Sequence, residues 1–385
     1  MRRGKENKKR VKGEVNANAI GSYRLGIWPW STVGGSMRPN NLVIELDEKL
    51  AEKNLEGLWN EALWDSDAKI MTKDPQTAVV PYLWQSDDII PHLERAGEII
   101  GLEGKVERRT LRLVNPGLAN LRGQKRATTQ TIHMSVQLLL PGEHATSHRH
   151  NFGAFRFIIK GEGAYTVVEG EKFVMEEGDL ILNPPNAWHG HGNDAEPIIW
   201  LDGLDYPLII SLQVLTWEAF PGDFQPLKDY AEYTEHRAGA ARPVGQPQQL
   251  GPLAYKWKDT YETLSNLRDT EGSPFDGVAL EYTNPSNNGY TFPTMSCGVQ
   301  MLRGGEETQT HRHNSCTIYH AFRGSGTTVI DGEEFHWRQG DCFVIPLWAW
   351  HSHKNGAKNE DAILFSVNDM PVMKALKLYR EEAAD

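Results

Sequence analysis

The sequence predicts a mainly β protein with two copies of one antiparallel barrel or sandwich domain, because it contains an internal repeat and short strand-sized segments separated by glycine. The segment GEHATSHRHNFGAFRFIIKGEG at 142–163 returns as GEETQTHRHNSCTIYHAFRGSG at 305–326. A second block, GDLILNPPNAWHGHGN at 178–193, returns as GDCFVIPLWAWHSHKN at 340–355. Two blocks that recur in the same order at nearly the same offset indicate a duplicated domain.

Each copy is expected to consist of antiparallel strands. The stretch RFIIKGEGAYTVVEGEKFVMEEGDLILNPP at 156–185 alternates short runs of valine, isoleucine, phenylalanine and tyrosine with glycine. Turn signals at intervals of about eight to twelve residues are typical of sandwiches and barrels. The helical period of about 3.6 residues is not sustained in this stretch, so no helix is expected in it.

Helices are expected before the first copy and at the end of the chain. Apolar positions recur at helical spacing in 43–65 and 87–100, although Pro91 should delay the start of the second helix. We therefore expect a helical cap over residues 41–105. Residues 1–40 begin with the basic run MRRGKENKKRVK, which no apolar stretch follows, so a flexible tail is expected there rather than a secretory signal.

The repeat and its connector divide the rest of the chain. We expect the first barrel domain over residues 106–238, a linker over 239–252 and the second barrel domain over 253–385. The linker GAARPVGQPQQLGP is poor in apolar residues and rich in glycine, proline and glutamine. The final residues 374–385, KALKLYREEAAD, are expected to form a helix with a frayed end.

Composition excludes several classes of protein. The net charge of -11 argues against a nucleic-acid surface, and no apolar run approaches the roughly 18 residues that a membrane span needs. The cysteines Cys297, Cys316 and Cys342 form no CxxC pair, so neither a disulfide framework nor a thiolate zinc site is indicated. A reducing, cytoplasmic location is expected.

Histidines in the repeated blocks predict a metal site. His148 and His150 alternate along one strand and so share a face, and His189 follows one strand and turn later. Three neutral imidazoles suit a first-row divalent ion such as Fe(II), Mn(II), Ni(II) or Zn(II), and they leave coordination positions open. The second copy repeats the triple to within one residue of spacing, which makes it a possible second metal site: His311, His313 and His351.

These blocks resemble the two motifs of the cupin superfamily. The first copy matches at Gly142, His148, His150 and Gly161, then at Gly178, Pro184, His189 and Asn193. The second copy matches at Gly305, His311, His313 and Gly324, then at Gly340, Pro346, His351 and Asn355. The glutamate of the first motif is replaced by Ala154 and Thr317, so three histidines must suffice. The loss of an anionic ligand favours an anionic, bidentate substrate.

The pattern HRHxxxAxRF with a later HGH is similar to the gentisate 1,2-dioxygenase family, which includes salicylate and 1-hydroxy-2-naphthoate ring-cleaving dioxygenases. Further matching stretches are VERRTLRLVNPGL at 106–118, WLDGLD at 200–205 and VPYLWQSDDII at 80–90. The resemblance covers roughly residues 45–380. It implies a bicupin, with two tandem antiparallel double-stranded β-helix (jelly-roll) barrels and a helical N-terminal segment. It also implies one Fe(II) per N-terminal cupin and a homo-oligomer, either a dimer or a tetramer.

The resemblance assigns roles to individual residues. Arg108 and Arg156 match arginines near the substrate carboxylate, although Arg108 could instead be a surface charge. His191 is expected to act as an acid or base, or to hydrogen-bond behind the site, and Asp202 to orient side chains. The predicted substrate-binding residues are Arg108, Arg156, His133, Thr110, Ser135 and Gln137. His133 stands where family members have an aromatic residue, so it either bonds a ring substituent or fills space.

The resemblance implies an enzyme that inserts both atoms of O2 between the carboxyl-bearing and hydroxyl-bearing carbons of a hydroxylated aromatic carboxylate. Gentisate, giving maleylpyruvate, is the leading substrate; salicylate, substituted salicylates and 1-hydroxy-2-naphthoate are alternatives. A non-oxidative isomerase or decarboxylase and a non-enzymatic storage or sensory bicupin are the rival classes. In the second copy Tyr319 replaces Arg156, so we expect structural or vestigial metal binding there.

Overall fold

The computed structural model describes residues 30–33, 36–39, 41–57, 59, 72–102, 106, 108–119, 126–228, 254–284 and 287–384. The chain forms two compact units, residues 1–73 and 74–385. The expected linker at 239–252 lies outside the described residues. In the described part of the chain, no helix is long and apolar enough to cross a membrane.

The first unit differs from the expected tail and cap. Strands β1 (Trp30–Val33) and β2 (Ser36–Pro39) pair as a hairpin, so the predicted flexible tail contains regular structure. Helix α1 (Asn41–Ala51) follows and ends earlier than the helix expected over 43–65. The expected cap over 41–105 is divided between the two units, because its second helix belongs to the larger one.

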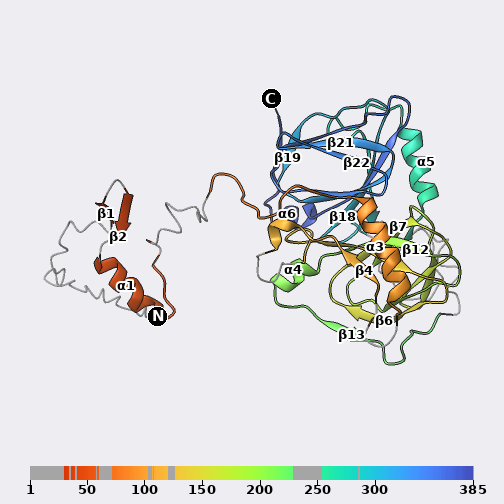
Figure 1. The fold of residues 1–385 in the computed structure, drawn as a ribbon, viewed down its shortest axis with the longest axis horizontal. Helices are drawn as coiled ribbons and strands as arrows, with labels where there is room; N and C mark the ends of the chain where they lie inside the picture. The colour runs from red at the N-terminus through yellow and green to blue at the C-terminus, as the bar shows by residue number, and fades with distance from the viewer. Residues whose placement is uncertain are drawn as a thin grey trace, which may run out of the picture. The chain divides into compact units, whose positions relative to one another are not determined.

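The larger unit is mainly β and contains two antiparallel barrels, as predicted (Figure 1). The first barrel pairs a six-stranded sheet, β14-β10-β7-β12-β5-β4, with a five-stranded sheet, β13-β6-β11-β8-β9. The strands of this barrel are β4 (Thr110–Arg112), β5 (His133–Leu139), β6 (His144–His150), β7 (Ala154–Lys160), β8 (Tyr165–Val168), β9 (Glu171–Val174), β10 (Leu180–Asn183), β11 (His189–Gly192), β12 (Ile198–Leu204), β13 (Trp217–Ala219) and β14 (Ala254–Tyr255). A 3-10 turn, η1 (Pro116–Leu118), follows β4, and helix α4 (Tyr206–Ser211) connects β12 to β13.

The second barrel repeats this arrangement. Its sheets have the orders β15-β18-β25-β20-β23-β3 and β22-β21-β24-β19-β26. Its strands are β3 (Tyr82–Trp84), β15 (Val278–Glu281), β18 (Ser296–Leu302), β19 (His311–His313), β20 (Thr317–Arg323), β21 (Ser325–Ile330), β22 (Glu333–Arg338), β23 (Cys342–Ile345), β24 (His351–Lys354), β25 (Ala362–Asn368) and β26 (Glu381–Ala383). Helices α5 (Trp257–Leu267) and α6 (Met370–Ala375) and the short pair β16 (Thr283–Asn284) and β17 (Gly289–Tyr290) complete it.

Each barrel contains a strand from outside its own repeat. Strand β3 precedes the first barrel in the chain but pairs with β23 of the second, and β14 pairs with β10 of the first. Helix α3 (Ser86–Ile99) follows β3 and packs against β5. Pro91 lies inside this helix and does not delay its start. The two barrels are therefore not separable at a single linker.

Alternation along the strands creates two different environments. On β7, Phe155 and Phe157 face the second barrel, where the Phe157 ring stacks on Phe365 at a centroid distance of 4.0 Å. Arg156 points the opposite way, into the first barrel, because neighbouring side chains of a strand lie on opposite faces. One apolar cluster thus joins the barrels, and polar residues are left for the barrel interior.

The C-terminal segment is not the predicted helix. Helix α6 ends at Ala375, and β26 then pairs with β19 beside the end of the chain (Figure 1). In the first copy, α4 is followed by β13, which pairs with β6 in the same way. The repeat therefore extends through a helix and an edge strand that the two sequence blocks do not reveal.

A buried histidine between the barrels makes stability dependent on pH. Burial lowers the pKa of His320 to about 4, and its ring Nδ1 lies 3.5 Å from Cys342 Sγ. A pKa below that of the unfolded chain means that stability is lost as the pH falls from about 6.5 towards 4. Between pH 7 and pH 5, the free energy of unfolding should fall in the parent and in His320→Asn. We expect the fall to be about 2 kcal/mol smaller in His320→Asn, because the variant lacks this buried imidazole. Urea unfolding at both pH values measures this difference. His336→Asn, at an exposed position, is the control and should behave as the parent. If His320→Asn lost as much stability as the parent, His320 would not be the source of the pH dependence.

Candidate metal centre

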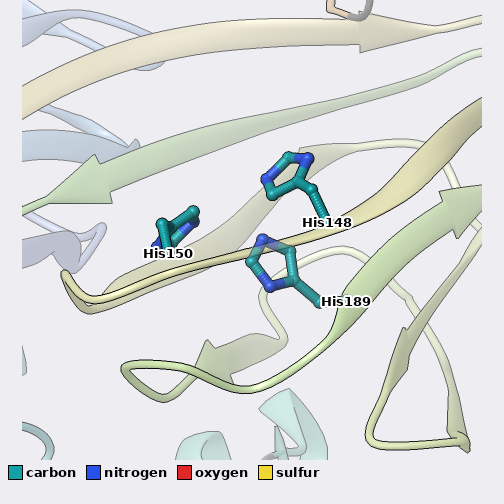
Figure 2. Close-up of side chains that lie close together, drawn as sticks. All are labelled: His148, His150 and His189. Atoms are coloured by element: carbon teal, nitrogen blue, oxygen red, sulfur yellow. The ribbon is translucent and has the colours of Figure 1, made fainter. Parts of the chain in front are cut away.

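Three histidines meet inside the first barrel, as the sequence predicts. His148 and His150 lie on β6, and His189 on β11 is the direct register partner of His148. The potential ligand atoms of the three residues lie within 4.8 Å of one another. Figure 2 shows the three rings approaching one another from these two strands. Such a cluster can bind one divalent ion and leave positions open.

Backbone carbonyls fix two of these rings. Nδ1 of His150 lies 2.8 Å from the carbonyl oxygen of Phe152. Nδ1 of His189 lies 3.0 Å from the carbonyl oxygen of Ala187. Since a carbonyl only accepts, Nδ1 carries the proton and Nε2 keeps its lone pair. The buried Nε2 of His189 has no partner among the described groups. A metal ion would satisfy it, so the donor set is compatible with the ion that the sequence predicts.

The histidines are held in the neutral form that binds metal. Burial lowers the pKa of His148 to about 2, with a further contribution from Arg108. Burial also lowers the pKa of His150 to about 4. Protons therefore do not compete with a metal ion for these two rings at neutral pH.

Arg156 is buried opposite the histidines. Its Nε lies 3.3 Å from Asp202 Oδ1, and the two residues are register partners on β7 and β12. Burial raises the pKa of the Asp202 carboxyl, and Arg156 opposes that rise. In the described structure, Nη1 of Arg156 is buried without a hydrogen-bond acceptor. A buried donor of this kind is costly unless a ligand pairs with it, so the site is prepared for an anion.

Arg108 reaches the metal site and is not a surface charge. Its Nη2 lies 3.1 Å from His148 Nδ1 and 3.3 Å from the Thr146 carbonyl oxygen. A guanidinium only donates, so His148 Nδ1 accepts in this arrangement. Metal binding at Nε2 of His148 therefore requires Arg108 to release this contact.

The other predicted residues also line the barrel interior. His191 Nδ1 bonds to Thr166 Oγ1, and its buried Nε2 has no partner in the described part of the chain. Thr110 Oγ1 donates to Gln137 Oε1 at 3.2 Å. On β5, Ser135 is the register partner of Asp202, and His133 packs 4.9 Å from the Tyr206 ring, centroid to centroid.

Four neighbours of this site were not predicted from the sequence. The ring of Trp217, on β13, lies 5.7 Å from that of His148, and Phe152 stacks on His150 at 3.6 Å. Tyr206 contacts His133. Asn183 on β10 is the register partner of Ala154 on β7, and its buried amide has no partner within the described structure. Trp217 could have been found by extending the repeat, because YPLIISLQVLTWEA at 206–219 aligns with MPVMKALKLYREEA at 370–383.

An imidazole triad that could hold a metal ion, inside a jelly-roll barrel, is typical of the cupin fold, and the described part of the chain contains this arrangement twice. The family model described as Cupin domain matches residues 135–203 and 298–368.

The chain is similar to several 1,2-dioxygenases that act on aromatic hydroxy acids. A 5-aminosalicylate 1,2-dioxygenase from Comamonas sp is 40% identical over 90% of this chain and 92% of its own. A 1-hydroxy-2-naphthoate 1,2-dioxygenase from Nocardioides sp. is 36% identical over 87% and 86%. A salicylate 1,2-dioxygenase from Pseudoaminobacter salicylatoxidans, solved as a variant with gentisate, has a TM-score of 0.79 and 32% identity, and the match covers 91% of this chain and 98% of that one.

The chain belongs to the family of gentisate, salicylate and 1-hydroxy-2-naphthoate 1,2-dioxygenases. It is accordingly an oxidoreductase that incorporates dioxygen and cleaves an aromatic ring. The non-oxidative isomerase or decarboxylase and the storage or sensory classes are not supported.

Proposed function

We propose that the first cupin is an Fe(II)-dependent site that cleaves the ring of a 2-hydroxybenzoate, with gentisate to maleylpyruvate as the leading reaction. A 5-substituted relative such as 5-aminosalicylate is the nearest alternative; salicylate and 1-hydroxy-2-naphthoate follow. The observation that carries the proposal is the buried, unpaired Nη1 of Arg156 in the same barrel as the histidine triad. A carboxylate would pair with this donor.

The residues of the chain hold and orient the reactants. His148, His150 and His189 would bind the iron, which supplies a path for electrons between an electron-rich ring and dioxygen. Arg156 binds the substrate carboxylate, and Asp202 orients the guanidinium. His191, which is neutral because burial holds its pKa well below the usual value, exchanges a proton near the reacting oxygen.

His133 supports a substrate with a hydrogen-bond donor on the ring. Its Nδ1 lies 3.2 Å from the Arg126 carbonyl oxygen and so carries the proton, which leaves Nε2 as an acceptor. Burial lowers the pKa of His133 to about 4, so the ring stays neutral at pH 7. A hydroxyl or amino group at ring position 5 would donate to it, which favours gentisate and 5-aminosalicylate over salicylate.

Replacing His133 should change substrate preference more than overall activity. We expect His133→Phe to lower kcat/KM for gentisate relative to salicylate by about 10- to 100-fold, because the acceptor is lost while ring packing is retained. Steady-state kinetics with both acids measure the ratio. The buried but more distant His320→Asn is the control, and an unchanged ratio in His133→Phe would remove His133 from substrate recognition.

The proposal is tested by oxygen uptake after anaerobic loading with Fe(II). Gentisate, 5-aminosalicylate, salicylate and 1-hydroxy-2-naphthoate are offered separately to the same loaded protein. We expect the fastest uptake with gentisate, and faster uptake with 5-aminosalicylate than with salicylate. Uptake that is fastest with 1-hydroxy-2-naphthoate would overturn the substrate assignment, and no uptake with any of the four would overturn the activity.

A further inference from the structure

The second barrel retains the histidines but reverses the charge around them. His311, His313 and His351 offer ligand atoms within 4.8 Å of one another. Their cluster borders a cavity of about 330 Å³ inside this barrel, and none of the described residues that line the cavity is a lysine or arginine. Three lining residues are acidic instead: Asp276, Glu281 and Glu381.

Equivalent strand positions show where the reversal arises. Arg156 pairs with Asp202 across β7 and β12, whereas the matching pair across β20 and β25 is Tyr319 with Ser366. On the other side of β5, Ser135 pairs with Arg112 of β4. The residue equivalent to Ser135 in the second barrel is Gly298 on β18, and it pairs with Glu281 of β15. The second cavity therefore lacks the buried guanidinium that the first offers to a carboxylate.

The edge strands β13 and β26 carry a third difference between the two barrels. Trp217 on β13 is the register partner of His150, and Glu381 on β26 is the register partner of His313. Trp217 packs against His148, but Glu381 Oε1 lies 3.3 Å from His311 Nδ1. The Tyr379 hydroxyl donates to the other carboxylate oxygen at 3.0 Å and so helps to hold Glu381 in place.

These contacts prepare Nε2 of each histidine for a cation. The carbonyl oxygens of Ser315 and Ala349 lie 2.9 Å from Nδ1 of His313 and His351. Glu381 takes the same place at His311, where a carboxylate that accepts from Nδ1 fixes the tautomer and the orientation of the ring. In this described region, Nε2 of both His311 and His351 is buried without a partner.

We propose that the second cupin is an independent divalent-cation site, in which His311, His313 and His351 bind the ion and Glu381 positions His311. Its acidic wall favours a cation and excludes a second aromatic carboxylate, because like charges repel in a poorly solvated cavity. The chain would then hold two metal ions but bind its anionic substrate at one of them.

Calorimetric titration of the metal-free chain with Zn²⁺ tests the site without any activity measurement. We expect two equivalents per chain in the parent and one equivalent in each of the variants His189→Ala and His351→Ala. Glu381→Gln should bind two equivalents, with the second weakened by about 10- to 100-fold. The equivalent that remains in each variant shows that the protein is folded.

Glu382→Gln is the matched control, because Glu382 neighbours Glu381 but bonds to Arg312 at 2.7 Å. It should bind both equivalents as the parent does. A single equivalent in the parent that is lost in His189→Ala would overturn the second site. Equal affinities in Glu381→Gln and Glu382→Gln would overturn the role of Glu381.

Substrate exclusion is measured on the Zn²⁺-loaded chain with gentisate in the absence of oxygen. We expect one gentisate per chain in the parent and in His351→Ala, and affinity for gentisate weakened by about 10²- to 10³-fold in Arg156→Met. Two gentisates per chain in the parent would overturn the exclusion, whatever the metal titration gives. Because the metal count does not depend on ring cleavage, failure of the proposed reaction would leave that count unaffected.

Discussion

His189→Ala should lower kcat/KM for ring cleavage by about three orders of magnitude or more, to the level of the metal-free protein. His189 is buried, its Nδ1 is fixed by the Ala187 carbonyl, and its unpaired Nε2 belongs to the triad. Two imidazoles would remain, which is fewer than metal catalysis in such a site uses. Oxygen uptake and bound iron, measured on the same sample, should fall together.

The repeat supplies a matched control for this variant. His351→Ala removes the equivalent ring of the second barrel. Nδ1 of His351 bonds to the carbonyl oxygen of Ala349, as Nδ1 of His189 bonds to that of Ala187. We expect it to retain at least half of the parent activity. If His351→Ala abolished uptake and His189→Ala did not, the catalytic site would lie in the second cupin.

Arg156→Met should lower kcat/KM by about 10²- to 10³-fold, mainly through a higher KM. The buried guanidinium is proposed to pair with the substrate carboxylate, and loss of one partner of a buried charged hydrogen bond costs about 2–5 kcal/mol. The change also leaves the Asp202 carboxylate buried without its cation. Steady-state kinetics separate KM from kcat.

Two further variants test the explanation. Arg149→Met removes an exposed arginine that bonds to Glu218 at 2.6 Å, and it should behave as the parent. Asp202→Asn keeps the guanidinium but weakens its orientation, so we expect a smaller loss than in Arg156→Met. A KM unchanged in Arg156→Met would contradict carboxylate binding by this residue.

The histidine triad could be predicted because local spacing determines it. Two residues apart on one strand, His148 and His150 must share a face, and the repeat locates His189 on a neighbouring strand. The same alternation places Ser135 and Gln137 in the barrel and Phe157 between the barrels. These features depend on strand period alone.

Long-range pairing could not be predicted in this way. Strand β3 has three residues between a helical segment and a loop, and only its pairing with β23 makes it a strand. Strand β26 was expected to be helical because KALKLYREEA has helix-forming residues, but its pairing with β19 overrides that preference. As a result, Glu381 and Trp217 reach their histidines through contacts that local sequence does not signal.

The reaction proposed for the first cupin inserts both atoms of O2 into a hydroxylated aromatic carboxylate. Its most direct test is mass spectrometry of the product formed from gentisate and isotopically labelled dioxygen by the Fe(II)-loaded chain. We predict a ring-opened acid that carries two labelled oxygen atoms, formed by His351→Ala but not by His189→Ala. A product with one labelled atom, or with the ring intact, would contradict ring cleavage by a dioxygenase reaction at this site.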